Sequence, residues 1–179
     1  LSKNPDIENN TNLLKYLINK DLSEADINKA CEKIKFFNKK TNDDYLQKFK
    51  IYCLINGSNL AVAQLQYDLL NEKGPIDNFY NKKINYLLGY TEETDDEVSD
   101  KNLLNFYLSH IVNSDFQYDP SMKTSKYIWK YLSSSNLLED PNSIDLEDET
   151  KFNLYEWAAA NNSYNKKELF NIYGKFLFS

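Results

Sequence analysis

The chain has 179 residues, of which 41% are hydrophobic and 15% aromatic, so it can form one compact core or two small ones and is not expected to be disordered. It contains only four Gly and four Pro, too few turn residues for a sandwich or a barrel, and this favours helices. No apolar run reaches the roughly 18 to 20 residues that a membrane-spanning helix needs, so we expect no membrane insertion.

The net charge of −6 argues against a polyanionic partner. All 21 basic residues are lysine, and arginine, the preferred residue for phosphates and base edges, is absent. We therefore expect no nucleic-acid partner. Six acids lie within residues 91–100 and another six within 139–149. Such stretches are usually solvated, and neither has the ligand spacing of an EF-hand.

Apolar residues at helical spacing, separated by polar turns or Gly, predict nine short helices, and no segment alternates as a strand would. The inward stripes of the first five are Leu13, Leu14, Leu17 and Ile18; Ile27, Ala30, Cys31 and Ile34; Tyr45, Phe49, Tyr52 and Cys53; Ala63, Tyr67 and Leu70; and Tyr80, Ile84, Leu87 and Leu88. Ser23 and Asp26 form a predicted capping box before the second helix. Gly57, Gly74 and Gly89 are predicted to end the third, fourth and fifth helices.

The pattern continues after the acidic stretch, where Ser99 is the expected cap of the sixth helix. The stripes of the last four helices are Leu104, Tyr107, Leu108 and Ile111; Tyr127, Ile128, Trp129, Tyr131 and Leu132; Leu154, Trp157 and Ala158; and Leu169, Ile172, Tyr173 and Phe176. We predict an all-α fold of about nine antiparallel helices stacked as helical hairpins, an α-solenoid with a right-handed superhelix. Residues 1–90 are the predicted helical-hairpin repeats, 91–100 an acidic connection, and 101–179 a second helical segment packed on the first, in two domains or one continuous domain.

One stretch carries a family resemblance. Ala63, Tyr67, Leu70 and Pro75, preceded by Gly57, resemble the second helix of a tetratricopeptide repeat over about 30 residues. In that family the small residue allows close helix approach, the aromatic and apolar residues fill the groove, and Pro ends the hairpin. The resemblance implies a concave surface that binds a protein or peptide. An irregular α-bundle with similar helix lengths is the alternative.

The two cysteines allow two interpretations. Cys31 and Cys53 lie on the apolar faces of neighbouring predicted helices, at similar heights above the turn between them. A disulfide between them is geometrically possible and would indicate an exported or periplasmic protein, because such bonds persist in oxidising compartments. Two buried free thiols, expected for a cytoplasmic protein, are the other interpretation.

No catalytic or metal-binding motif is recognisable. His110 is the only histidine, and we interpret it as a structural residue. The chain has no nucleophile elbow, no phosphate-binding glycine loop and no dinucleotide fingerprint. We therefore expect no enzyme activity, no cofactor and no metal.

The sequence favours a non-enzymatic helical-repeat scaffold that binds a protein or peptide. The partner-binding candidates are inner-helix aromatics, since tyrosine is a favoured interface anchor: Tyr52, Tyr67, Tyr86 and Tyr107. Because the sequence begins at Leu1, we expect it to be a piece of a longer or processed protein. The alternative function is the non-catalytic helical portion of a larger enzyme, such as one that acts on cell walls.

Overall fold

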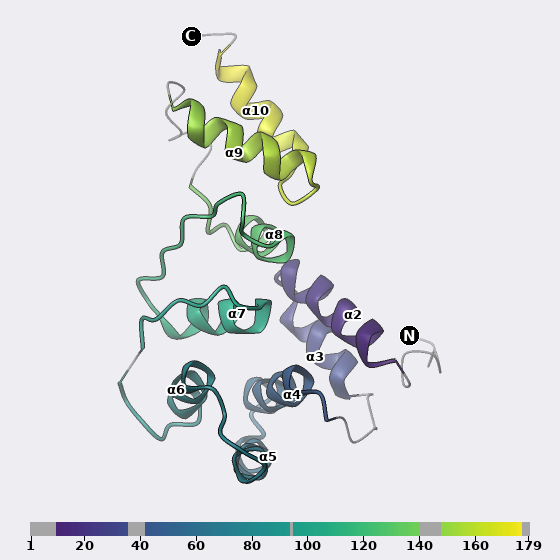
Figure 1. Cartoon of the computed structure of the whole chain (residues 1–179), viewed down its shortest axis with the longest axis vertical. Coiled ribbons are helices and arrows are strands. Elements are labelled where there is room, and N and C mark those ends of the chain that lie inside the picture. Colours follow the sequence, from purple (N-terminus) through teal and green to yellow (C-terminus); the bar gives the residue numbers. More distant parts are fainter. Residues whose placement is uncertain (1–9, 36–41, 94, 140–147, 177–179) are drawn as a thin grey trace. The chain divides into compact units, whose positions relative to one another are not determined.

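A computed structural model describes residues 10–35, 42–93, 95–139 and 148–176 (Figure 1). Over these residues the chain forms nine helices and no strand, which confirms the predicted all-α fold. The helices are α2 (Thr11–Ser23), α3 (Ile27–Lys35), α4 (Asp44–Asn56), α5 (Leu60–Glu72), α6 (Asn78–Leu87), α7 (Leu103–Val112), α8 (Lys126–Ser134), α9 (Glu149–Ala160) and α10 (Lys166–Phe176). Among them, none is long and apolar enough to cross a membrane.

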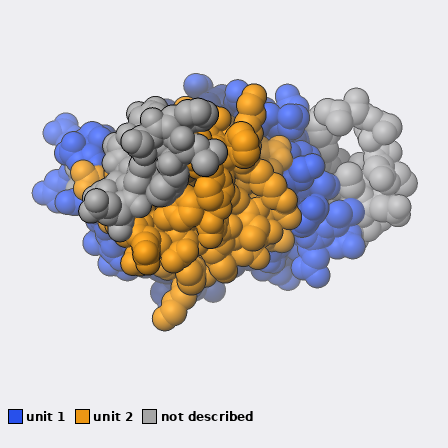
Figure 2. All heavy atoms as spheres, turned by 90° about the horizontal axis from the view of Figure 1, so that it is seen from above, with its two compact units in different colours: residues 1–21, 26–116 blue, residues 22–25, 117–179 orange. Residues whose placement is uncertain are grey.

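The chain divides into two compact units, which Figure 2 shows in different colours. The first unit comprises Leu1–Asp21 and Asp26–Phe116, and the second comprises Leu22–Ala25 and Gln117–Ser179. This division lies beyond the predicted connection at 91–100, because α7 packs against α6 and so belongs to the first unit.

Helix α4 is the central helix of the first unit. Its buried side chains surround the helix instead of forming one stripe, as expected for a helix enclosed by neighbours: they are Leu46, Lys48, Phe49, Ile51, Tyr52 and Cys53. It packs against α3 and α5, and the Tyr80 hydroxyl of α6 donates a 2.8 Å hydrogen bond to the Lys48 carbonyl. Its Tyr52 also contacts Tyr107 of α7. These contacts join α4 to helices beyond its chain neighbours and do not establish a regular solenoid.

The second unit has a small aromatic core. Its buried members are Trp129, Tyr155, Ala158, Ala159, Tyr164 and Ile172. Helices α9 and α10 pack against each other as a hairpin. The Trp129 indole donates a 3.1 Å hydrogen bond to the Ser121 carbonyl, which fixes the loop before α8 to this core.

The predicted capping box at Ser23 is wrong, because Ser23 is the last residue of α2. The cap of α3 is instead Asp26, whose carboxylate accepts a 3.0 Å hydrogen bond from the Lys29 amide. The chain reverses between the two helices at Ala25, which has a φ of 58°. A single residue in the left-handed conformation thus allows a turn too short for a separate N-cap at Ser23.

Gly57 follows the end of α4 as predicted, but it does not take the left-handed conformation. Gly57 has a φ of −85°, and the next residue, Ser58, takes the left-handed conformation with a φ of 58°. Gly89 does have the expected role, since it follows α6 with a φ of 78°.

Candidate interaction surface

Two of the four tyrosines predicted to bind a partner lie inside the first unit. Tyr52 and Tyr107 are 4% and 8% exposed, and their hydroxyls are 2.7 Å apart. Burial raises the pKa of Tyr107, and the adjacent Tyr52 hydroxyl adds to this effect, so the phenol stays protonated. Both side chains therefore hold α4 to α7 and do not present a surface to a partner.

A third predicted anchor, Tyr67, is also internal. It is 4% exposed, and its hydroxyl donates to Asn85 of α6 at 2.9 Å and also contacts Asn81. Tyr86 is half-buried and is the only one of the four whose ring reaches the surface of the first unit. The four tyrosines therefore do not form one exposed tract, because most of their area is used in packing between helices.

The structure joins Cys31 and Cys53 in a disulfide, with a Cα–Cα distance of 5.4 Å. Each cysteine is 4% exposed, so the bond lies in the core between α3 and α4. Of the two interpretations of the cysteines, the structure therefore has the disulfide and not two free thiols. It fixes the pairing of two helices that follow one another in the sequence.

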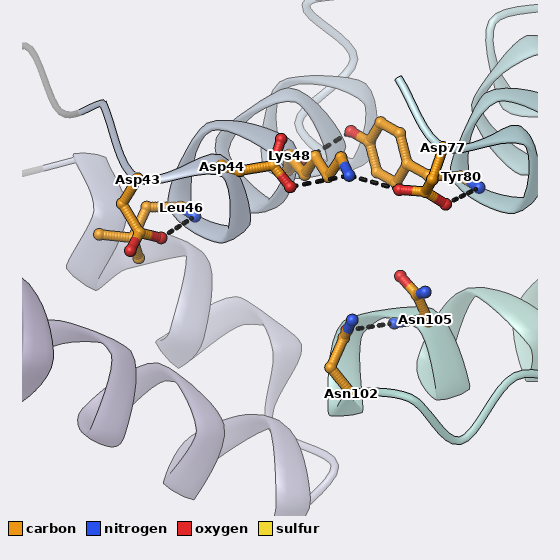
Figure 3. Close-up of polar contacts among 8 residues, drawn as sticks. All are labelled: Asp43, Asp44, Leu46, Lys48, Asp77, Tyr80, Asn102 and Asn105. Carbon is orange, nitrogen blue, oxygen red and sulfur yellow. Dashed lines mark hydrogen bonds and ion pairs between the residues drawn. The ribbon is translucent and has the colours of Figure 1, made fainter. Parts of the chain in front are cut away.

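A buried lysine ties α4 to the start of α6 (Figure 3). The Lys48 ammonium lies 2.8 Å from the Asp44 carboxylate and also contacts Asp77, while it sits 5.2 Å from the centre of the Tyr80 ring. Asp77 in turn caps α6 by accepting a 3.0 Å bond from the Tyr80 amide. Lys48 thus links a carboxylate of its own helix to the residue that caps α6, and this contact positions the two helices.

The acidic stretch at 91–100 is anchored to α6 by two lysines. The fully buried Lys83 donates from Nζ to the Asp95 carbonyl, and Lys82 lies 3.4 Å from the Asp95 carboxylate and 3.6 Å from Glu97. A cavity of about 280 Å³ lies here. Within the described residues, no group of His, Cys, Asp or Glu is arranged to hold a metal ion.

His110 lines neither this cavity nor a second one in the first unit. The larger, of about 300 Å³, lies between the start of α4 and the end of α5 and is lined by residues that include Asp44, Leu70 and Lys73. His110 is on α7, with its ring 5.2 Å from that of Phe116. Burial lowers the pKa of His110, which favours the neutral imidazole. His110 is half-buried, and its interpretation as a structural residue stays a prediction.

Among the described residues of the first unit, α5 carries more large exposed apolar side chains than any other helix. Four of its side chains are large, apolar and exposed: Leu60 (45%), Val62 (40%), Leu65 (56%) and Leu69 (43%). The opposite face packs inward through Ala63, Tyr67 and Leu70. The sequence pattern predicted only the inward face, although apolar residues occupy both sides of the segment LAVAQLQYDLL. Val62, Leu65 and Leu69 lie on one side of the helix and are called the α5 face, whereas Leu60 lies at the helix start on the side of Ala63 and Tyr67.

The N-terminus of α5 differs from those of its neighbours. Asn59 occupies its N-cap position, and its side chain makes no capping hydrogen bond. Side chains cap α4, α6 and α7, and Figure 3 shows these three bonds, from Leu46 to Asp43, Tyr80 to Asp77 and Asn105 to Asn102. The α5 face therefore begins at a helix end whose amide groups have no side-chain acceptor.

The resemblance to a tetratricopeptide repeat gains no independent support. Ala63, Tyr67 and Leu70 are buried, as they would be in any helix packed along that side. No protein-family model matches this chain, and no curated protein or solved structure is similar to it at a significant level.

Proposed function

We propose that this chain is a non-enzymatic helical domain that binds a protein through the α5 face. The observation that carries the proposal is the clustering of Val62, Leu65 and Leu69 on one side of α5, each at least 40% exposed. Single exposed leucines are ordinary, but a contiguous apolar patch usually marks an interaction site.

The geometry of the α5 face favours a helical partner. Val62, Leu65 and Leu69 follow each other at spacings of three and four residues, which places them in one row along the helix. A second amphipathic helix can lay its own apolar row against such a surface. The exposed side of α5 would then be the binding surface, while its opposite side packs on α4.

A neutral helical peptide tests this proposal. The probe is a fluorescently labelled peptide of about four turns, with leucines on one face and equal numbers of lysine and glutamate on the other, so that binding does not depend on net charge. We expect fluorescence polarisation to detect micromolar binding. The double variant Leu65→Asn/Leu69→Asn should lose at least about tenfold in affinity, because two buried leucines no longer contribute.

The matched control is Phe170→Asn, which removes another exposed apolar side chain, 72% exposed, from α10 in the second unit. Its affinity for the peptide should stay within about twofold of the wild type. Equal losses in both variants, or no binding by the wild type, would contradict the proposal.

We also propose that the chain works in an oxidising compartment. The buried disulfide between Cys31 and Cys53 supports this, because structural disulfides are rare in reducing compartments. The test is an intact-mass measurement of protein from its native source, alkylated without reductant in a denaturant that exposes both buried cysteines. We expect no alkylated cysteine, and two alkylated cysteines would refute the compartment assignment.

A further inference from the structure

We infer that the protein bound by the α5 face is a second copy of this chain, with the two α5 helices packed antiparallel about a two-fold axis. This inference rests on the proposed function, because it names the partner of the same surface. It is argued from the pattern of apolar residues along α5 and from the distribution of charge between its two ends.

The apolar row of α5 is close to symmetric about Leu65. Val62 lies three residues before Leu65 and Leu69 lies four residues after it. When two antiparallel copies meet at Leu65, Val62 of each copy faces the region of Leu69 in the other. Each leucine or valine of the row then packs against an apolar residue, as a two-fold interface requires.

The charges of α5 lie in one half of the helix, and the reversed direction keeps those of two copies apart. Its carboxylates, Asp68 and Glu72, are exposed and lie in the C-terminal half, whereas residues 60–67 carry no charge. Within the described residues, neither carboxylate takes part in an ion pair. In a parallel pair these acids would face one another, which is unfavourable. The charge pattern therefore selects the antiparallel orientation.

The antiparallel arrangement also provides an acceptor for the uncapped helix end. Glu72 lies seven residues after Leu65, and Ser58 lies seven residues before it. Glu72 of one copy therefore lies beside Ser58 and Asn59 of the other, where the amide groups of α5 have no side-chain cap. A carboxylate at a helix N-terminus is stabilised by those amides and by the helix dipole.

The size of the α5 face indicates a weak, reversible dimer. The helix has 13 residues and is about 20 Å long at 1.5 Å per residue. One helix of this length cannot bury the roughly 1,600 Å² of a standard stable interface. We therefore expect a concentration-dependent dimer with a dissociation constant in the micromolar range or weaker.

Cysteine cross-linking tests the orientation. In Leu65→Cys the two new thiols meet at the axis, so mild oxidation should give a disulfide-linked dimer. In Leu69→Cys, an equally conservative change on the same row, an antiparallel pair keeps the new thiols about 12 Å apart along the helix, too far for a disulfide. Efficient cross-linking of Leu69→Cys, or none of Leu65→Cys, would refute the antiparallel dimer.

Sedimentation equilibrium separates this inference from the proposed function. We expect the wild type and Phe170→Asn to dimerise alike and Leu65→Asn to stay monomeric. Glu72→Lys should weaken dimerisation about fivefold, because it places a positive charge at the helix N-terminus of the other copy.

A wild type that stays monomeric up to about millimolar concentration overturns the self-pairing. If that monomer still binds the neutral peptide through Leu65 and Leu69, the protein-binding function stands and only the identity of the partner is wrong. If it binds neither, both fail.

Discussion

The hydroxyl groups of Tyr52 and Tyr107 lie 2.7 Å apart, and the two rings meet edge to face with their centres separated by 5.2 Å. The residues are 55 positions apart in the sequence and belong to α4 and α7. This pair therefore joins the central helix of the first unit to the last one. Both hydroxyls are buried, so the short bond between them satisfies polar groups that would otherwise be costly to bury, and the Tyr52 hydroxyl also lies 3.5 Å from the Asn56 side-chain oxygen.

Removing one hydroxyl of this pair should destabilise the first unit. We expect Tyr107→Phe to lower the free energy of unfolding by about 1 kcal/mol, because it leaves the buried Tyr52 hydroxyl with a poorer partner. The measurement is urea unfolding followed by circular dichroism. Tyr86→Phe is the control, since its half-buried hydroxyl makes no hydrogen bond within the described residues. A loss of similar size in Tyr86→Phe would argue against a specific role for the Tyr52–Tyr107 bond.

The disulfide should contribute strongly to the stability of the first unit. It links residues separated by 22 positions, and closing a loop of that length stabilises the folded chain by about 3 kcal/mol on the chain-entropy model. The double variant Cys31→Ala/Cys53→Ala should therefore unfold at a lower urea concentration than the oxidised wild type. Adding reductant should shift the wild type in the same direction and leave the variant unchanged. If the oxidised wild type and the variant unfold at the same midpoint, the bond does not stabilise the fold.

The ion pair between Lys48 and Asp77 makes the stability of the first unit depend on pH. Burial acts to raise the pKa of Asp77, but hydrogen bonds from Lys48 and the Tyr80 amide, with the charge of Lys48, outweigh it and lower the pKa. A carboxylate whose pKa is lower in the folded state stabilises the fold above its unfolded-state pKa of 3.8 and loses this contribution as the pH falls through the folded value.

The asparagine variant of this residue tests the coupling. Asp77→Asn cannot titrate, so between about pH 5 and pH 2 its free energy of unfolding should fall less steeply than that of the wild type. Asp115→Asn, in the exposed loop after α7, is the control and should keep the pH dependence of the wild type. Parallel curves for the wild type and Asp77→Asn would exclude Asp77 as the source of the acid sensitivity.

Local spacing was sufficient to predict where the helices lie. In α3, for example, Ala30, Cys31 and Ile34 are all buried, as their positions at helical spacing predicted. Such patterns predict helices because the residues on the buried face of a short helix recur every three or four positions within one segment. The ends of the helices were less predictable, and the cap at Asp26 shows that two residues with suitable side chains compete for one role.

Contacts between distant segments could not be predicted in the same way. Lys48 and Asp77 are 29 positions apart, and nothing in either segment identifies the other as its partner. The tyrosines were interpreted as partner anchors because composition alone does not distinguish an interface from a core. In α5 both sides are apolar, so only the packing of the unit determines that Tyr67 lies inside and Leu65 outside.

Two glycine substitutions should have opposite effects on stability. Gly89 has a φ of 78°, so Gly89→Ala forces a side chain into the left-handed conformation and should cost about 1 to 2 kcal/mol. Gly174 lies within α10, and an added Cβ there would meet nothing within 4 Å, so Gly174→Ala should stabilise that helix by up to about 1 kcal/mol. Because the residues belong to different units, peptide-resolved hydrogen exchange is the appropriate measurement. We expect faster exchange in α6 for Gly89→Ala and slower exchange in α10 for Gly174→Ala. If Gly89→Ala instead slowed exchange in α6, the turn after α6 would not require a positive φ at this position.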